Sequence, residues 1–156
     1  MKWAELRPDV PVPAKPTGIW TLAHDFLEGP ALLRIDATGT WSYGDEPCGP
    51  DGDLRPQASA DHAILPAAPL GALLVKIGGS TAGTNDGVVR VVGTTAVLGI
   101  GEKGGPVFLT INDELTGLLD NSGEVVAKLS WFRLPKTDAP APVPSESAEA
   151  KEKAKP

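Results

Sequence analysis

The stretch VFLTINDELTGLLDNSGEVVAKLSWF, residues 107–132, contains two apolar runs separated by a polar segment. The first run (107–112) and the second (124–132) are rich in branched and aromatic residues, and Asp, Asn and Gly lie between them. Apolar runs bounded by turn-forming residues are typical of β-strands. This stretch therefore predicts two strands joined by a loop, with one helical turn near residues 113–119.

Similar short runs occur on the N-terminal side of this stretch, again separated by turn residues. They cover residues 18–23, 31–36, 39–43, 71–77, 87–92 and 96–100. The 156 residues include 18 Gly and 16 Pro. Inside a helix, Gly and Pro cost about 1 and 3 kcal/mol relative to Ala, so long helices are excluded. The series of short strands predicts an all-β fold, a small β-sandwich of the jelly-roll type.

Both ends of the chain differ in composition from the middle. Residues 7–16 (RPDVPVPAKP) contain four prolines and predict an extended, polyproline-like segment. Residues 135–156 are rich in Pro, Ala, Glu and Lys and lack aromatic residues, so they cannot bury enough surface to offset their ordering entropy. We predict a proline-rich arm over residues 1–17, one β-sandwich domain over 18–134, and a disordered low-complexity tail over 135–156.

The charge and the rare residue types exclude several classes of partner. A net charge of −6 argues against nucleic acid, which is bound mainly through clustered Lys and Arg. No apolar stretch approaches the roughly 20 residues that cross a bilayer, and the N-terminus lacks the apolar core of a signal peptide. We expect no membrane insertion, and a location in the cytoplasm or outside the cell after export without a classical signal peptide. One Cys and two His are too few for structural zinc.

Catalytic machinery is not indicated by the few nucleophiles and bases. Cys48 lies between Pro47 and Gly49, and His24 and His62 lie far from it in sequence. A Cys–His pair stays open as an alternative, since such partners can meet in space alone. The carboxylates show no spacing that identifies an acid and a nucleophile for glycoside hydrolysis. We therefore predict that the protein is not an enzyme.

Oxygen-bearing side chains are densest between the two strands of the opening stretch. Calcium takes six to eight oxygen ligands from carboxylates, amides, carbonyls and water, and Asp113, Asp120 and Asn121 fit that need. Their spacing differs from the EF-hand pattern. An ordinary loop is the alternative, because Asp, Asn and Gly are also common turn residues.

Several segments, taken in chain order, resemble sequence segments of one protein family. They are GTWSYG (39–44), GPDGD (49–53), GALLVKIG (71–78), GVVR (87–90), IND (111–113) and DNSG (120–123). The corresponding family segments are Gly-Trp-Ala-Ser-Tyr-Gly, Gly-Pro-Gln-Gly-Asp, Gly-Ala-Leu-Val-Met-Lys-Ile-Gly, Gly-Leu-Phe-Arg, Tyr-Asn-Asp and Asn-Asn-Ser-Gly. The chain thus resembles the PA-IL-type galactose-binding soluble lectins of bacteria over about residues 18–131.

The resemblance implies one calcium ion (Ca²⁺) per domain, whose coordination shell is completed by two adjacent hydroxyl groups of the sugar. Carried over by position, Tyr43 and Gly117 would offer backbone carbonyls, Asp113 its carboxylate, and Asp120 and Asn121 their side-chain oxygens. Asp120 replaces an asparagine of the family. Two carboxylates instead of one should raise calcium affinity.

The sugar contacts implied by the resemblance involve the same loop and a second one. Tyr43, Asp113, Gly117 and Asp120 would face the sugar, together with Glu114, which stands where the family has valine. The family also uses a histidine and a glutamine that follow the Gly-Pro-Gln-Gly-Asp segment.

Direct counting places Pro56 and Ser59 at those two positions, and neither can do the same work. The loop that leads to Gly71 is longer here than in the family, so His62 or Gln57 is expected to occupy the space instead.

The leading prediction is a calcium-dependent carbohydrate-binding lectin for galactose or galactosides. Single sugar sites bind modestly, so a homo-oligomer or docking to a larger assembly is expected. The alternative is a structural or adaptor jelly-roll module of a larger assembly that has lost sugar binding, motivated by the altered hexose-contact loop and by the two unusual ends of the chain.

Overall fold

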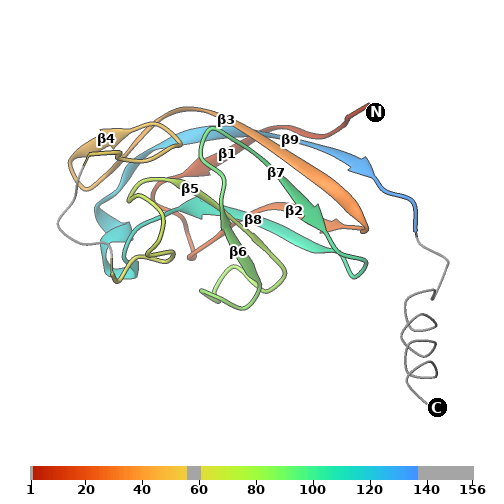
Figure 1. Ribbon diagram of the computed structural model, residues 1–156. Helices are drawn as coiled ribbons and strands as arrows, with labels where there is room; N and C mark the ends of the chain where they lie inside the picture. Colours follow the sequence, from red (N-terminus) through yellow and green to blue (C-terminus); the bar gives the residue numbers. More distant parts are fainter. Residues whose placement is uncertain (1, 56–60, 137–156) are drawn as a thin grey trace, which may run out of the picture.

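Two antiparallel β-sheets lie face to face in the computed structural model, which describes residues 2–55 and 61–136 (Figure 1). The first sheet contains β1 (Ala4–Pro13), β9 (Ser122–Arg133), β3 (Ala31–Tyr43) and β4 (Glu46–Cys48) in that order, with β7 (Thr95–Ile100) also paired to β3. The second contains β2 (Thr21–Leu27), β8 (Gly105–Ile111), β5 (Leu73–Ile77) and β6 (Val88–Val91) in that order. A 3-10 helix, η1 (Leu115–Asp120), connects β8 to β9. The predicted all-β sandwich is confirmed.

The main core lies between the sheets and follows the two-residue period of the strands. In β3, Leu33 and Ile35 are fully buried and Arg34 is exposed, because successive side chains point to opposite faces of a sheet. Leu129 of β9 and Val75 of β5 complete the same core. A smaller apolar cluster covers the outer face of the second sheet and contains Trp20, Ile64, Ala68, Leu74 and Phe108.

A fully buried lysine lies beside this smaller cluster. The Lys76 ammonium donates hydrogen bonds to the carbonyls of Ser80 and Gly83, each at 2.6 Å, and forms an ion pair with Asp86. It also lies 5.0 Å from the ring centroid of Trp20 and 5.1 Å from that of Phe108. A buried charge is tolerated only when it is paired in this way. Lys76 therefore fastens the loop that follows β5 to the body of the sandwich.

The N-terminal segment differs from its sequence-based prediction. Residues 4–13 do not form an arm outside the domain; they form β1, an edge strand paired to β9 from Ala4↔Trp131 to Pro13↔Glu124. Val10 and Val12 of this strand are buried in the main core. Proline is tolerated there because an edge strand has one side on which no N–H is needed. The sandwich therefore begins before residue 18.

Two other predictions change in detail. The runs 31–36 and 39–43 are parts of one strand, β3, which pairs with β9 without interruption through Gly39. The segment between β3 and β5 contains the short strand β4, and Asp51 of this segment forms a bridge with Ala72. Of the predicted tail, residues 137–156 lie outside the described residues. No helix in the described part of the chain is long and apolar enough to cross a membrane.

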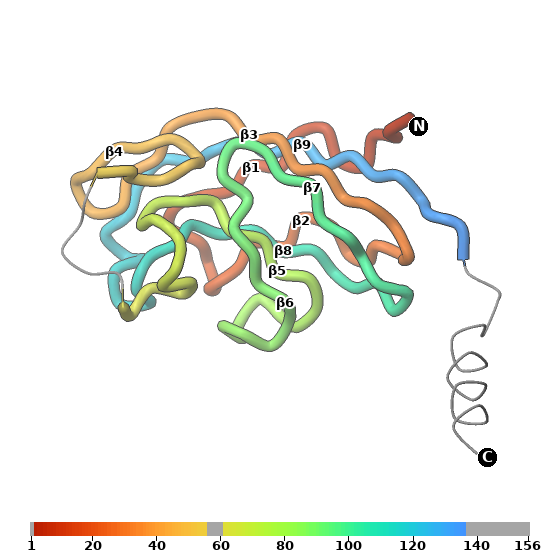
Figure 2. Tube along the Cα trace, viewed as in Figure 1, coloured from red at the N-terminus to blue at the C-terminus, as the bar shows by residue number. Residues whose placement is uncertain are grey.

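One end of the sandwich gathers segments that are distant in sequence (Figure 2). The β3–β4 hairpin, helix η1 and the segment that leads into β5 meet there, at the left in this view. Two contacts tie them together: Gly44 N–H donates to Asn121, and Ile64 N–H donates to the Asp113 carbonyl. The residues predicted to bind calcium come from these segments.

Candidate functional site

Asp113 lies where β8 ends, and helix η1 folds over its carboxylate. The residue is 7% exposed, and its Oδ1 accepts a hydrogen bond from the Glu114 N–H at 2.8 Å. The nearby Asn121 side chain acts on this carboxyl group by lowering its pKa. A Cβ atom at Gly117 would lie 3.1 Å from each carboxylate oxygen, which is closer than most real Cβ contacts. Residue 117 therefore suits glycine because the helix backbone packs directly on Asp113.

Asn121 connects three parts of the fold at this site. Its side chain is almost completely buried; Oδ1 accepts the Gly44 N–H at 3.0 Å, and Nδ2 donates to the Ala14 carbonyl at 3.1 Å. The structure thus brings Asp113, Gly117, Asn121 and the Tyr43–Gly44 peptide together. Asp120 is exposed at the end of η1 and is close enough to influence the Asp113 carboxyl group.

Burial and neighbouring negative charges act on the Asp113 carboxyl group. Burial raises the pKa of this carboxyl group above its ordinary value of 3.8, and the charges of Glu114 and Asp120 raise it further. The hydrogen bond from Glu114 N–H and the Asn121 side chain partly oppose this rise. Within residues 2–55 and 61–136, no Lys, Arg or His forms an ion pair with Asp113. A desolvated carboxylate among further negative charges is stabilised by a cation.

The oxygen groups present fit calcium better than a transition metal. They comprise the Asp113 and Asp120 carboxylates, the Asn121 amide, and the backbone carbonyls of Tyr43 and Gly117, all of them hard ligands. In the described part of the chain, no group of three or more His, Cys, Asp or Glu could hold a metal ion. A site in this position would therefore take much of its coordination from amide, backbone and water oxygens.

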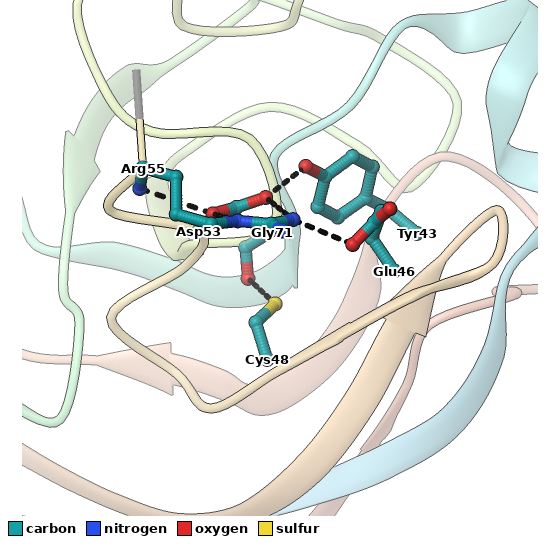
Figure 3. A network of polar contacts seen from close by, with 6 residues as sticks. All are labelled: Tyr43, Glu46, Cys48, Asp53, Arg55 and Gly71. Atoms are coloured by element: carbon teal, nitrogen blue, oxygen red, sulfur yellow. Dashed lines mark hydrogen bonds and ion pairs between the residues drawn. The ribbon is translucent and has the colours of Figure 1, made fainter. Parts of the chain in front are cut away.

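The Tyr43 side chain points into a polar network with Asp53, Arg55 and Glu46 (Figure 3). Its hydroxyl donates to Asp53 Oδ2 at 2.5 Å, and the Arg55 guanidinium donates to both oxygens of the same carboxylate, at 2.9 and 2.7 Å. Arg55 also pairs with Glu46 at 2.5 Å. Asp53 is only 8% exposed, although the Asp-Gly-Asp sequence at residues 51–53 is typical of an exposed turn.

The Tyr43 phenol is expected to titrate far above its ordinary value. Burial, the hydrogen bond to Asp53, and the charges of Asp53 and Glu46 raise the pKa of Tyr43 from 10.0 to about 12, and Arg55 opposes the rise. The chain has one tyrosine, so tyrosinate absorbance reports this residue alone. We expect a midpoint near pH 12 in the folded protein, and Asp53→Asn should lower it. A folded-state midpoint near pH 10 would contradict the network.

The raised pKa of Tyr43 also makes the stability of the fold depend on pH. The native state keeps a proton that the unfolded chain releases above pH 10, so the stability linked to this hydroxyl is complete below pH 10 and is lost as pH rises toward about 12. Phenylalanine has no hydroxyl to titrate. The unfolding free energy of Tyr43→Phe should therefore fall less between pH 10 and about 12 than that of the unmodified protein.

His62, one of the two alternatives for the second sugar contact, lies next to Glu114. A bridge joins Ala63 to Glu114, which places His62 next to Glu114. These two residues, with Leu115 and Thr116, line a shallow depression of about 390 Å³. Gln57 lies outside the described residues.

Asn112 organises this second loop, a role that its sequence context does not indicate. Its fully buried side chain donates to the carbonyls of Leu65, Ala68 and Pro69 at 3.0 to 3.1 Å, and accepts the Leu65 N–H at 2.9 Å. A buried amide at the end of a strand must satisfy its donors and acceptor somewhere, and here it does so in the 65–69 segment. Asn112 therefore positions the loop next to the candidate ligands.

Comparison with known proteins relates the chain to solved structures and not to known sequences. No family model matches the chain, and no curated protein matches it in sequence. Among solved structures, the chain is similar to the EclA N-terminal domain, described as a PllA-like lectin, with a TM-score of 0.59 and 18% identity over 83% of this chain and 98% of that chain. The two-sheet sandwich is therefore the fold of a known lectin domain.

Proposed function

We propose that this protein is a calcium-dependent lectin whose sugar site lies at the end of the sandwich formed by η1 and the β3–β4 turn. The observation that carries the proposal is Asp113, a carboxylate 7% exposed, with a raised pKa and no cationic partner in the described part of the chain. The lectin description of the EclA domain supports carbohydrate as the ligand class.

The ligand set follows from the side chains and backbone that meet at this end. Asp113 and Asp120 would supply carboxylate oxygens, Asn121 its amide oxygen, and Tyr43 and Gly117 their carbonyls. Asn121 Oδ1 already accepts the Gly44 N–H, and an amide oxygen retains a second lone pair for an ion. Calcium bound here would supply the orientation of two adjacent sugar hydroxyls and much of their affinity.

The sugar would extend from the calcium toward His62 and Glu114. Imidazole and carboxylate groups bind hydroxyls through hydrogen bonds, and both residues line the depression beside η1. Tyr43, Asp113, Gly117 and Asp120 would adjoin the sugar through their place around the ion. The resemblance to galactose-binding lectins favours galactose or galactosides, and Gln57 is the alternative to His62 for the second contact.

Calorimetry should detect two linked binding events. Titration of the metal-free protein with calcium chloride should release heat at one site per chain, and a methyl galactoside should bind only after calcium is added. Asp113→Asn should abolish both events. Asp36→Asn, which removes a carboxylate paired with Arg34 on the surface of β3, should leave both unchanged. Absence of calcium binding in the unmodified protein would contradict the proposal.

One observation supports the adaptor alternative. Leu115 is 46% exposed and Leu119 is 73% exposed on η1, an apolar surface that a protein partner could cover. A glycan array that stays blank for the calcium-loaded protein, together with a stoichiometric protein partner lost in Leu119→Ser, would favour this function over the lectin.

A further inference from the structure

The identity of residue 43 is not explained by the ligand role proposed for it. A backbone carbonyl can come from any residue, yet position 43 holds the only tyrosine of the chain. Its side chain is fixed on two sides: the hydroxyl donates to Asp53, and the ring packs against Gly71. The side chain therefore has a task that is separate from the carbonyl.

The first anchor is a chain of charged contacts that encloses the hairpin turn. Tyr43 and Glu46 face each other across the β3–β4 hairpin, and Arg55 joins Glu46 to Asp53, which accepts the Tyr43 hydroxyl (Figure 3). Hydrogen bonds to ionised groups are about twice as strong as neutral ones. The turn between residues 43 and 46 is therefore held from both of its strands.

The second anchor is the backbone at Gly71. A Cβ atom at this residue would lie 3.1 Å from the Tyr43 ring and 2.5 Å from the Cys48 sulfur, and φ is +86°, so only glycine fits without strain. The Gly71 N–H donates to the Asn112 carbonyl at 2.8 Å. The ring of Tyr43 thus rests on backbone that is bonded to the residue immediately before Asp113.

The backbone that follows Tyr43 reaches the candidate site directly. Gly44 N–H donates to Asn121 Oδ1 at 3.0 Å, and Asn121 directly follows η1, the helix that packs on the Asp113 carboxylate through Gly117. The peptide between Tyr43 and Gly44 therefore lies between the side-chain network on one side and the candidate ligands on the other.

We propose that the chain of contacts Tyr43–Asp53–Arg55–Glu46 positions the Tyr43–Gly44 peptide against Asn121, and so sets the geometry of the proposed calcium site before any ion binds. The four side chains are positioning residues that act through the peptide and do not touch the ion. The link to calcium rests on the proposed function; the link to Gly44 does not.

Tyr43→Phe tests the inference, because it removes the hydroxyl and keeps the ring. In the metal-free protein, amide hydrogen exchange at Gly44 should become about tenfold faster, the size expected for loss of one hydrogen bond to a charged group. Calcium affinity measured by calorimetry should fall about tenfold for the same reason. Arg55→Gln should change both quantities in the same direction. Arg55→Lys, which keeps the positive charge, should change both by less.

Two controls separate positioning from general destabilisation. Ile35→Val weakens the main core, far from the network in sequence, and should speed exchange only at amides that open by global unfolding, without changing calcium affinity. Arg34→Gln removes an exposed ion pair on β3 and should change neither quantity.

The outcomes distinguish this inference from the proposed function. If the unmodified protein binds calcium, and Tyr43→Phe and Arg55→Gln leave both Gly44 exchange and calcium affinity unchanged, the positioning role is wrong while the lectin proposal stands. If calcium does not bind but Gly44 exchange accelerates as expected, the network positions the peptide and the lectin proposal fails. If Tyr43→Phe does not fold, Arg55→Gln decides, since the Arg55 side chain is 66% exposed.

Discussion

Asp113→Asn should change the thermal stability of the protein in opposite directions with and without calcium. In chelator, the substitution removes a charge that burial disfavours. The pKa of Asp113 is raised, so the native state binds more protons than the unfolded chain, and stability falls as pH rises above 3.8. A neutral amide avoids this cost, and the melting temperature of the variant should equal or exceed that of the unmodified protein.

In excess calcium the unmodified protein should have the higher melting temperature of the two. At a calcium concentration of 100 times Kd, binding to the native state stabilises by about 2.7 kcal/mol, which corresponds to a rise of about 5–10 °C in melting temperature. The variant should gain almost none of it. Circular dichroism melts in chelator and in calcium chloride measure both effects, with Asp36→Asn as the control that should gain as much as the unmodified protein. Equal gains in the Asp113 variant would overturn the ligand assignment.

Protons should compete with calcium at the same carboxylate. Since the pKa of Asp113 lies above its ordinary value, calcium affinity should begin to weaken at a higher pH than for an exposed aspartate as the solution is acidified. Calorimetric titrations with calcium at a series of pH values measure the pH at which calcium affinity begins to fall.

Lys76→Ala should cause the largest loss of stability in the fold, about 3–5 kcal/mol. The substitution leaves a cavity between Trp20 and Phe108 and removes the donor for the carbonyls of Ser80 and Gly83. Chemical denaturation with urea measures the change in unfolding free energy. Lys128→Ala, at an exposed position of β9, should change stability by less than about 0.5 kcal/mol.

Lys76→Met separates packing from charge. Methionine fills most of the same space but donates no hydrogen bond, so its cost should lie between those of the other two variants. A Lys76→Ala variant as stable as Lys128→Ala would show that the contacts of the ammonium do not fasten the loop.

Sequence patterns located most strands but not those whose formation depends on neighbours. The strands β5, β8 and β9 are rich in branched and aromatic residues, which favour strands. β4 has only the three residues Glu-Pro-Cys, and only its pairing to β3 makes it a strand. β1 carries prolines that favour an extended arm in isolation, and its pairing with β9 and the burial of Val10 and Val12 decide otherwise.

The candidate site likewise contains residues that sequence patterns indicate and residues that only the fold brings together. Asp113 and Asn121 were singled out because oxygen-rich residues cluster between two strands. The network of Asp53 and Arg55 was missed, since a Gly-Pro-Asp-Gly-Asp segment is also what an exposed turn contains. Only the folded chain reveals that the Tyr43 hydroxyl reaches Asp53 and that Arg55 returns to Glu46.

The prolines of β1 also affect how this protein meets copies of itself. β1 is the outermost strand of its sheet, with β9 on one side and no strand on the other among the described residues. Pro8, Pro11 and Pro13 have no N–H, so the free margin offers few donors to an incoming strand. Growth of the sheet from one molecule to the next, the first step toward fibrous aggregates, is therefore discouraged on this side at any protein concentration.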